Sequence, residues 1–445
     1  MNVFFISLGC DKNLVDSEQM LGLLAEKNYR IVDDPELADI AVVNTCSFIL
    51  DAEDESVKAI LEMSDYKKEG SLKALIVTGC LAQRYEKDIM QEIPEVDAVL
   101  GTNSYNRIIE AVETALGGGK YDEADALEGI PEVKSKRLLS TPSHYAYLKI
   151  AEGCAKNCSY CIIPQLRGKY RSLPMDELME QTKDLAAQGV KELILVAQET
   201  TLYGIDLYGK KKLPELLQRL SLVNGIEWIR LLYCYPEEIT DELIAEIKTN
   251  PKVCHYLDMP IQHTEDAVLK RMGRRTNHKE LKELIEKLRR EIDDIAIRTT
   301  LIAGFPGETE EEHEELMYFI NEASFDRLGV FAYSREEGTP AAEMEGQIPE
   351  EQKEAWRDEI MELQQEITAD CNKKMVGKRL RVLIDGYMPD NEVYAGRTYR
   401  DAPDVDGYIF VHSNRKLMSG DMIDVLVTGA YEYDLTGDEI NESAE

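Results

Sequence analysis

Three cysteines in one short stretch have the spacing of ligands for a metal centre. Cys154, Cys158 and Cys161 form a C-x3-C-x2-C pattern, with Gly153 before them and Pro164 after them. Thiolates this close in sequence can wrap a loop around one inorganic core, and an iron–sulfur cube usually takes four cysteines. With only three supplied locally, one iron keeps an open position, which is where a catalytic ligand binds.

A zinc loop with a fourth ligand from elsewhere, or chance clustering, is the alternative explanation of this stretch. Zinc signatures usually come as paired C-x2-C units with a distant partner pair. The sequence has no second pair of that kind. The spacing therefore favours an iron–sulfur cluster in which one iron remains open to a further ligand.

Three more cysteines stand at matching places in the first quarter of the chain. Cys10, Cys46 and Cys80 each follow a short apolar run and precede a helical pattern. Because the carboxyl ends of parallel strands lie at one edge of a sheet, we expect these thiols to converge there. Three ordinary buried cysteines are the alternative, but a second metal site with three thiolates accounts better for the shared position.

Alternating strand and helix patterns place the first three cysteines. Apolar runs at 3–8, 40–43 and 74–77 alternate with helical patterns near 14–27, 52–67 and 83–93. Short buried runs separated by helices predict a doubly wound parallel sheet. A connector rich in glycine, proline and charge follows, with a small strand expected at 136–139.

The middle of the chain repeats a strand–helix unit six times. The repeat predicts a partial (βα)6 barrel with its site at the carboxyl ends of the strands, the face that carries Cys154. The expected strands are 146–150, 193–196, 228–232, 255–258, 296–302 and 327–331. The expected helices include 175–188, 265–272, 279–290 and 310–323.

A long helix and a small β domain are expected at the end of the chain. The pattern at 349–375 predicts one charged helix, with Trp356, Ile360, Leu363 and Ile367 on one stripe. Short strands at 380–384, 393–397, 407–411 and 422–427 then predict a small OB-like β-barrel. The fold class is therefore α/β. We expect an N-terminal domain at 1–118, a linker at 119–143, the partial barrel at 144–374 and the small barrel at 375–441.

The amino-acid composition indicates the cellular compartment of the protein and the state of its thiols. Of 445 residues 44% are hydrophobic, and no apolar run approaches the roughly 20 residues of a membrane helix. The first residues lack a basic segment, so we expect a cytoplasmic protein with reduced thiols. We expect Cys234, Cys254 and Cys371 to be small buried hydrophobic residues.

The charge balance is strongly acidic. A net charge of −34 repels phosphate backbones and attracts basic partners, although general solubility would also account for it. From Val376 to the end there are seven Lys and Arg residues and fourteen Asp and Glu residues. This charge balance is opposite in sign to that of an RNA-binding surface. Arg271, Arg274 and Arg275 are either scattered arginines or a cluster at a helix end.

The stretch C-x3-C-x-aromatic-C, with Tyr160 as its aromatic residue, resembles the signature of the radical S-adenosylmethionine enzymes. The resemblance implies that S-adenosylmethionine chelates the open iron and is cleaved to a 5′-deoxyadenosyl radical. It also implies that Tyr160 lies near the adenine. Arg167 and Arg171 would supply positive charge beside this cluster, or would form solvated salt bridges instead.

The same resemblance assigns further contacts to S-adenosylmethionine. Gln198 and Glu199 occupy the region where that family contacts the methionyl amine. The segment 302–308, with Gly304, Pro306 and Gly307, is similar to the family's adenosine-binding segment; taken alone it is a turn and a helix cap. No catalytic residue is expected beyond the cluster ligands.

Two cysteine groups in this order, followed by a terminal β-barrel, resemble the methylthiotransferases over nearly the whole chain. That resemblance implies a 4Fe-4S cluster on Cys10, Cys46 and Cys80, a second 4Fe-4S cluster on Cys154, Cys158 and Cys161, and a TRAM domain as the last barrel. The family places a methylthio group on an unactivated carbon and uses two S-adenosylmethionine molecules.

The segments 7–18, 256–263 and 298–308 resemble the branch that modifies the β-carbon of an aspartate in small-subunit ribosomal protein S-twelve. Asp11 stands where that branch usually has proline, but this position is not a ligand. The branch implies that ribosomal protein, free or in the small subunit, as partner and a reducing donor such as flavodoxin or ferredoxin. From the lack of a long apolar run and from the acidic charge we expect no membrane and no nucleic acid as direct substrate.

Three other functions remain open at the level of sequence. The first is methylthiolation of an adenosine in transfer RNA, which uses the same two clusters but fits the acidic charge less well. The second is a different radical enzyme with an auxiliary cluster. The third is a non-catalytic zinc or RNA-binding module, which iron and sulfide analysis would separate from the enzymes.

Overall fold

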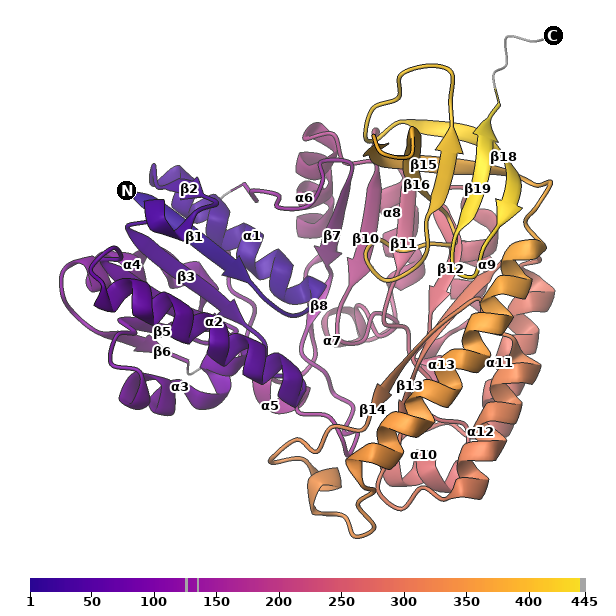
Figure 1. The fold of residues 1–445 in the computed structure, drawn as a ribbon, viewed down its shortest axis with the longest axis horizontal. Coiled ribbons are helices and arrows are strands. Elements are labelled where there is room, and N and C mark those ends of the chain that lie inside the picture. Colours follow the sequence, from indigo (N-terminus) through magenta and orange to yellow (C-terminus); the bar gives the residue numbers. More distant parts are fainter. Residues whose placement is uncertain (125–126, 134–135, 441–445) are drawn as a thin grey trace.

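A computed structural model describes residues 1–124, 127–133 and 136–440, and shows three domains in chain order (Figure 1). The N-terminal domain is a six-stranded parallel sheet in the order β2-β1-β3-β4-β5-β6. Its strands are β1 (Asn2–Ser7), β2 (Arg30–Val32), β3 (Ile40–Thr45), β4 (Ala74–Gly79), β5 (Ala98–Leu100) and β6 (Tyr121–Glu123). The doubly wound parallel sheet predicted from the sequence is confirmed.

Helices cover both faces of this sheet, because alternate strand residues point to opposite sides and both sides are apolar. One buried cluster includes Val42 and Ile76, and the other includes Val43 and Val77 on the opposite face. The helices are α1 (Asp11–Glu26), α2 (Leu50–Lys68), α3 (Cys80–Glu92) and α4 (Ile108–Leu116), with short 3-10 turns at Pro35–Leu37 and Tyr105–Arg107. Strands β2, β5 and β6 were not predicted, since three residues carry too little periodicity.

The segment between the first two domains differs from expectation at two places. Strand β6 extends the N-terminal sheet into residues that were expected to be linker. The strand predicted at 136–139 is wrong, because these residues have no regular structure. They lie instead against α1, where the backbone N–H of Leu138 donates to the carbonyl of Glu18 at 3.1 Å.

The central domain is a six-stranded parallel sheet in the order β14-β13-β12-β11-β10-β7, which confirms the predicted partial barrel. These strands are β7 (Tyr145–Lys149), β10 (Glu192–Val196), β11 (Trp228–Leu231), β12 (Val253–Asp258), β13 (Ala296–Ala303) and β14 (Arg327–Ala332). A two-stranded antiparallel ribbon, β8 (Ala151–Glu152) and β9 (Arg171–Ser172), brackets the cysteine stretch.

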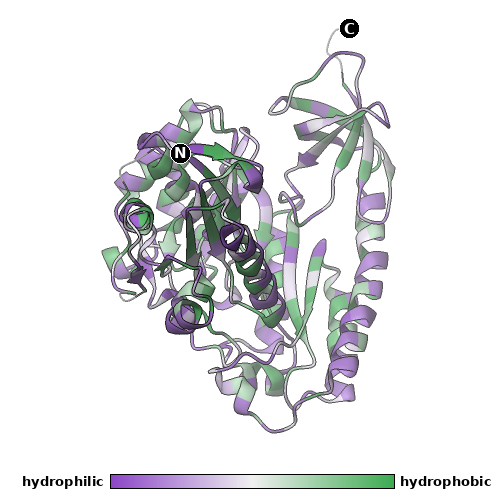
Figure 2. Cartoon of the chain, turned by 60° about the vertical axis from the view of Figure 1, so that its left-hand side comes forward, coloured by the Kyte–Doolittle hydropathy of each residue, from purple (hydrophilic) through white to green (hydrophobic). Residues whose placement is uncertain are grey.

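Most helices of the central domain pack on the outer face of its sheet. The helices are α5 (Ile163–Arg167), α6 (Met175–Ala187), α7 (Ile205–Tyr208), α8 (Leu213–Ser221), α9 (Asp241–Thr249), α10 (Asp266–Met272), α11 (His278–Glu291), α12 (Glu310–Ala323) and α13 (Glu350–Lys373), with 3-10 turns at Pro236–Glu238 and Pro340–Glu343. Two short helices differ: α5 contacts α3 of the N-terminal domain, and α7 lies beside β9. The stripe on α13 is buried at Trp356, Ile360 and Ile367 and packs with the central core, as predicted. Hydrophobic residues concentrate in the strands, and polar residues on the outer helix faces (Figure 2).

The C-terminal domain is a closed five-stranded barrel, which confirms the predicted small β-barrel. Its strands are β15 (Arg379–Met388), β16 (Val393–Thr398), β17 (Ile409–His412), β18 (Met422–Ala430) and β19 (Leu435–Glu439). Strand β19 was not predicted; it closes the barrel by pairing with β17 and β18. The predicted boundary at residue 441 lies outside the described residues.

The barrel docks on the inner face of the central sheet. Leu383 and Ala402 pack there with Tyr145 and Trp228, next to Val15 from α1. Arg397 crosses the interface to Glu192 at 2.6 Å, and the side chains of both residues are at most 1% exposed. Such a pair is costly to desolvate, so it fixes the docking geometry more than it adds stability.

Cys234, Cys254 and Cys371 are buried, as expected. Among the residues described, no helix has both the length and the apolar character needed to cross a membrane.

Candidate cluster sites between two domains

The first cysteine triad lies at the carboxyl edge of the N-terminal sheet, at three neighbouring strand ends. Cys10 caps α1 after β1, Cys46 follows β3, and Cys80 begins α3 directly after β4. Since β1, β3 and β4 are adjacent in the sheet, the three loops are neighbours. The structure therefore brings together three residues that are 36 and 34 positions apart in the sequence.

Two glycines allow these strand ends to approach one another. A Cβ on Gly9 would lie 2.7 Å from the Cβ and 2.8 Å from the Sγ of Cys46, and Gly9 has a φ of +86°. A Cβ on Gly79, with a φ of +95°, would lie 2.4 Å from Oδ1 of Asn44. Only glycine fits both the space and the left-handed backbone at these two positions.

The thiols of this triad affect one another's pKa. Burial raises the pKa of Cys46 to about 12, and the neighbouring thiols of Cys80 and Cys10 add to that increase. The Cys46 thiol is therefore protonated at neutral pH in the metal-free protein, and metal uptake must release its proton.

The second triad lies in the loop after β8, at the carboxyl end of the first central strand. Gly153 has a φ of +76°, and a Cβ there would lie 2.3 Å from the carbonyl of Lys169. The backbone N–H of Cys154 donates to the carbonyl of Gly168 at 3.1 Å, and that of Lys156 points to the Cys154 sulfur at 3.4 Å. Burial and the nearby thiols raise the pKa of Cys161 to about 12.

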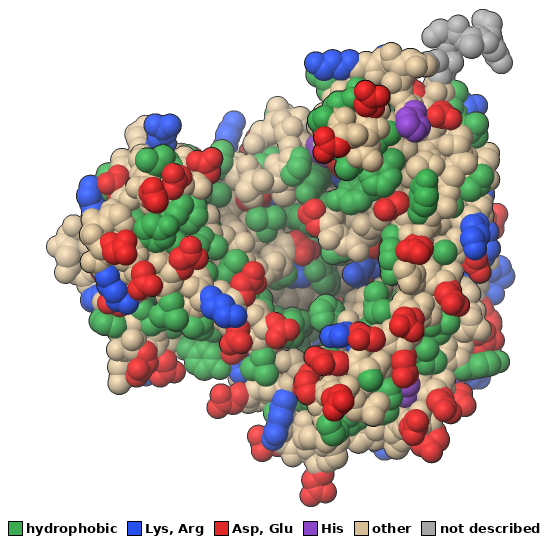
Figure 3. Space-filling model, in the orientation of Figure 1, with side chains coloured by type: hydrophobic (Ala, Val, Ile, Leu, Met, Phe, Trp, Pro, Cys, Tyr) green, Lys and Arg blue, Asp and Glu red, His purple; other side chains and the backbone are tan. Residues whose placement is uncertain are grey.

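The two triads meet where the N-terminal domain contacts the central domain. Cys80 packs against Ile162 and Leu166, and Ile162 is the residue directly after Cys161. The hydroxyl of Thr102 donates to the carbonyl of Leu166 at 2.6 Å in the same contact. Figure 3 shows a hollow between the left-hand and right-hand parts of the molecule, with many acidic side chains on this face.

The donor atoms fit iron–sulfur clusters better than single ions. Within the described residues, no group of three His, Cys, Asp or Glu is close enough to hold one metal ion. Cysteines that bind a cluster attach to different iron atoms, so they stand farther apart than the ligands of one ion. Two groups of three thiols at two strand edges are compatible with that requirement.

Gln198 and Glu199 follow β10. The Gln198 amide donates to Oε1 of Glu152 at 2.9 Å, and Glu152 stands two residues before Cys154. Glu199 is fully buried, and burial raises the pKa of its carboxyl to about 7. Its Oε1 accepts a hydrogen bond from the Thr201 backbone at 3.0 Å. Within the described chain, Oε2 of Glu199 and Oε1 of Gln198 have no hydrogen-bond partner. Two buried acceptors without donors are suited to an ammonium group.

The glycine segment after β13 also reaches the cysteine loop. The ring of Phe305 lies edge-on to Tyr160, with 6.5 Å between ring centroids. Gly304 has a φ of +76°, and a Cβ there would lie 2.2 Å from Lys353 of α13, so helix packing already requires glycine. Beyond Pro306, the Gly307 N–H donates to the carbonyl of Gly346 at 2.8 Å. The structure thus places Tyr160 and the segment 304–307 together.

Sequence reasoning missed two residues at the second triad. The hydroxyl of Tyr235 lies 3.7 Å from the Cys158 sulfur. The Arg274 guanidinium lies over the Tyr235 ring, 4.2 Å from its centroid, and donates to the carbonyl of Pro260 at 2.9 Å. Arg274 lies just past the end of α10, as the sequence suggested, but its side chain is buried. No local signal marks Tyr235, since it lies 74 positions after Cys161.

Arg167 differs from expectation in two ways: it is buried, and it lies near the first triad instead of the second. Arg167 is fully buried and points into the N-terminal domain, so it is not a solvated salt bridge. Its guanidinium is near Cys80 and Cys10 of the first triad. Arg171 donates to the backbone carbonyls of Lys169 and Arg167 at 2.6 and 3.1 Å.

Comparison with known proteins places each domain in a family. Residues 148–320 match the radical SAM superfamily, residues 376–440 match the TRAM domain, and residues 2–101 match the uncharacterized protein family UPF0004. A protein of Lachnoclostridium phytofermentans named ribosomal protein uS12 methylthiotransferase RimO is 59% identical over 98% of this chain and 99% of its own length. A relative of the same name from Thermoanaerobacter is 50% identical over 98% and 99%.

The chain belongs to the family of ribosomal protein uS12 methylthiotransferases. Solved structures share its fold at much lower identity. The radical S-adenosylmethionine methyltransferase TsrM from Kitasatospora setae, with cobalamin and a [4Fe-4S] cluster bound, is 13% identical. It has a TM-score of 0.53 and is covered over 78% of its length and 84% of this chain. Membership of the uS12 methylthiotransferases agrees with the resemblance found in the sequence.

Proposed function

We propose that this protein replaces a hydrogen on the β-carbon of an aspartate in ribosomal protein uS12 with a methylthio group. In this proposal Cys10, Cys46 and Cys80 hold an auxiliary 4Fe-4S cluster, and Cys154, Cys158 and Cys161 hold the 4Fe-4S cluster that binds S-adenosylmethionine. Two molecules of that cofactor would supply the methyl group and the radical chemistry.

One observation carries the proposal. Cys80 of the first triad packs against Ile162, the neighbour of Cys161 in the second triad. A reaction that joins a sulfur at one cluster to a carbon radical formed at the other needs both groups beside one cavity. Two clusters with separate tasks would not need such contact.

The chain's own residues would bind and orient the cofactor. Gln198 and Glu199 offer unpaired acceptor oxygens to the methionyl ammonium group. Tyr160 would lie by the adenine, and the segment Gly304, Pro306 and Gly307 would approach the adenosine. The Tyr235 hydroxyl, 3.7 Å from the Cys158 sulfur, would help to exclude water there. No further catalytic residue is proposed, since the protein's role is to position groups and exclude water.

The domain limits drawn from the sequence stay a proposal, with one change at the first boundary. We assign the auxiliary cluster to a domain at 1–118 that β6 extends to Glu123, a linker to the rest of 119–143, the radical cluster to a domain at 144–374, and substrate docking to the TRAM domain at 375–441. TRAM arginines Arg397 and Arg400 are paired to carboxylates of the central domain, so they are not free to bind phosphate.

The partner fits the acidic charge of the chain. Ribosomal proteins are rich in Lys and Arg, and a net charge of −34 favours their encounter with this protein, either free or in the small subunit. An RNA substrate would meet repulsion. Electrons would come from a low-potential donor such as flavodoxin or ferredoxin. The reaction would take place in the cytoplasm, away from any membrane.

Anaerobic reconstitution with iron and sulfide, followed by a substrate choice, tests the proposal. The reduced enzyme is offered S-adenosylmethionine with either uS12 or transfer RNA, and the products are weighed by mass spectrometry. A methylthio gain on the uS12 aspartate is expected. A gain on transfer RNA with none on uS12 would overturn the choice of substrate. Zinc without iron or sulfide in the protein would overturn the proposal that it is an iron–sulfur enzyme.

A further inference from the structure

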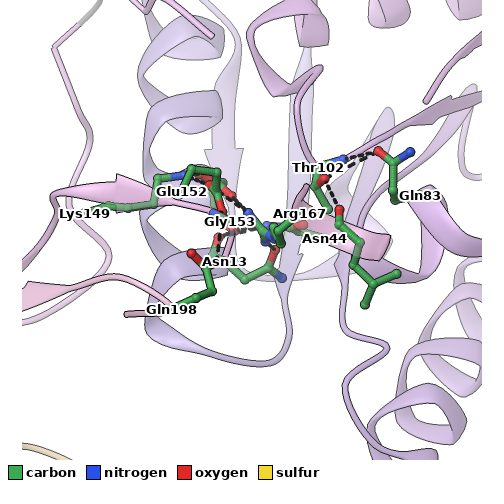
Figure 4. A network of polar contacts seen from close by, with 12 residues as sticks. Asn13, Asn44, Gln83, Thr102, Lys149, Glu152, Gly153, Arg167 and Gln198 are labelled. Carbon is green, nitrogen blue, oxygen red and sulfur yellow. Dashed lines mark hydrogen bonds and ion pairs between the residues drawn. The ribbon is translucent and has the colours of Figure 1, made fainter. Parts of the chain in front are cut away.

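Arg167 lies between the two cysteine triads. It is the last residue of α5, six positions after Cys161, and its side chain is 2% exposed. The side chain extends from the central domain, and its guanidinium contacts residues of the N-terminal domain. Nη1 donates to Asp16 Oδ2 at 2.7 Å, and Nη2 donates to Asn13 Oδ1 at 3.0 Å. Figure 4 shows Arg167 between Asn13 and Glu152.

Asn13 extends this contact to two of the three strand ends of the first triad. Its Nδ2 donates to the carbonyl of Leu8 at 2.6 Å and to the carbonyl of Thr45 at 3.2 Å. Leu8 stands two residues before Cys10, and Thr45 stands directly before Cys46. The position of Arg167 is therefore coupled through one amide to the backbone that carries both cysteines.

The third cysteine of the triad contacts the same helix directly. Cys80 packs on Ile162 and Leu166 of this segment. Arg167 directly follows Leu166, so its buried side chain starts from the backbone that packs on Cys80. Burial raises the pKa of the Cys80 thiol, and the Arg167 guanidinium opposes that increase. Cys10 is also within its electrostatic range.

Two buried cations and two buried carboxylates make up the ionic part of this network. Glu152 accepts from Lys149 at 2.7 Å and from Arg167 at 3.2 Å, and Asp16 also pairs with both cations. Lys149 lies on the other side of the network, 5.2 Å from the centroid of the Tyr105 ring. Of the two cations, Arg167 is the one that contacts Asn13, and it directly follows Leu166, which packs on Cys80.

A cation in this position has a definite effect on a cluster. Reduction adds one electron, taken from an external low-potential reductant, and makes a thiolate-bound cluster more negative. A buried positive charge stabilises that state, and cluster potentials depend on net charge and on hydrogen bonds to sulfur. The effect is strong at this site because little water screens it.

We propose that Arg167 is a positioning residue that couples the two triads and raises the reduction potential of the auxiliary cluster held by Cys10, Cys46 and Cys80. This inference rests on the proposed function, since it requires a cluster at that triad. The side chain acts through its charge and through its contacts with Asn13 and Asp16, and it takes no part in bond formation.

The test is a dithionite titration of full-length reconstituted protein, followed by electron paramagnetic resonance. All variants are made in the Cys158→Ala background, so that the auxiliary cluster alone gives the signal. Arg167→Met is expected to shift the oxidised-to-reduced ratio at fixed potential at least tenfold towards the oxidised form. For a one-electron couple, tenfold corresponds to 59 mV. Arg167→Lys keeps the charge and is expected to restore most of the potential.

Lys149→Met is the matched control, because it removes a cation that pairs with the same two carboxylates and lies by the Tyr105 ring. It is expected to lower thermal stability and to shift the potential much less than Arg167→Met does. Asp16→Asn keeps Arg167 but removes an opposing charge, so the potential should move in the positive direction. This variant decides the question even if Arg167→Met does not fold.

Equal potentials in Arg167→Met and Lys149→Met would overturn the inference, as would a negative shift or no shift in Asp16→Asn. The proposed function fails in a different way. If the Cys158→Ala parent takes up no iron and sulfide, the triad holds no cluster, and the proposed function itself is wrong. A loaded cluster with an unshifted potential would contradict only the role of Arg167.

Discussion

At the scale of single residues, the two proposed cluster sites use separate sets of thiols. Cys46 and Cys158 belong to different loops on different domains, and each has its own close neighbours: Gly9 lies against Cys46, and Tyr235 lies against Cys158. Loss of one thiol should therefore affect one cluster first.

We expect Cys158→Ala to lose cleavage of S-adenosylmethionine and to keep about half of the iron, because the N-terminal triad is intact. Cys46→Ala should keep reductive cleavage and lose methylthio transfer. Iron and sulfide analysis, with quantification of 5′-deoxyadenosine, measures both effects. If either single change emptied both sites, the assignment of two independent clusters would be wrong.

The buried carboxyl of Glu199 gives a prediction about pH. Its pKa is raised from 4.5 to about 7 by burial, so the folded state holds a proton that the unfolded state has lost between these values. Stability from this group is present below pH 4.5 and is lost as the pH rises to 7. The full shift corresponds to about 3 kcal/mol.

Glu199→Gln removes this titration while keeping the shape of the side chain. In the cluster-free protein, the variant should gain thermal stability over the wild type as the pH is raised from 5 to 8. Differential scanning measurements at several pH values check this. Parallel pH profiles for the two proteins would contradict the raised pKa.

At the scale of elements, the ends of β1 and β4 are shaped by glycines that allow three strand ends to meet. Gly9→Ala would place a Cβ 2.7 Å from the Cβ of Cys46 at a φ of +86°. A non-glycine residue in that backbone region costs of order 1–3 kcal/mol even without a clash. The clash also pushes Cys46 away from the triad.

We therefore expect Gly9→Ala to lose the auxiliary cluster, with about half of the iron, while cleavage of S-adenosylmethionine continues. Gly118→Ala is the control, since Gly118 has a φ of +79° and no heavy atom within 4 Å of an added Cβ. It should cost stability of order 1 kcal/mol and keep all the iron. Equal iron content in the two variants would show that the approach of Gly9 to Cys46 is unimportant.

At the scale of the whole molecule, the net charge and the docking of the domains determine how a protein substrate associates. The TRAM barrel uses Arg397, Arg400 and Asp401 in ion pairs with the central domain. These contacts occupy one side of the barrel. The acidic residues elsewhere contribute to the net charge of −34.

Association with uS12 should accordingly be steered by long-range attraction. The association rate is expected to fall about tenfold when salt shortens the Debye length from about 10 Å at 0.1 M to about 3 Å at 1 M. The dissociation rate should change much less, because close contacts are screened little. Surface plasmon resonance at several salt concentrations measures both rates. An association rate that does not depend on salt would remove the electrostatic argument for this partner.

The sequence by itself determined the two cysteine groups, the strand–helix order and the terminal barrel. These follow from local spacing and from hydrophobic periodicity, which act over a few residues. The position of Cys10, Cys46 and Cys80 at strand ends also followed, since a parallel sheet collects such ends at one edge.

Only the tertiary structure decided which side chains of distant segments surround the triads. Arg167 belongs by sequence to the second cysteine loop, yet it is buried against the first triad, and Tyr235 reaches Cys158 from a different loop. No periodicity encodes such pairs, because they arise when the faces of two domains pack together. The burial that raises the pKa of Glu199 likewise depends on packing against residues far away in the chain.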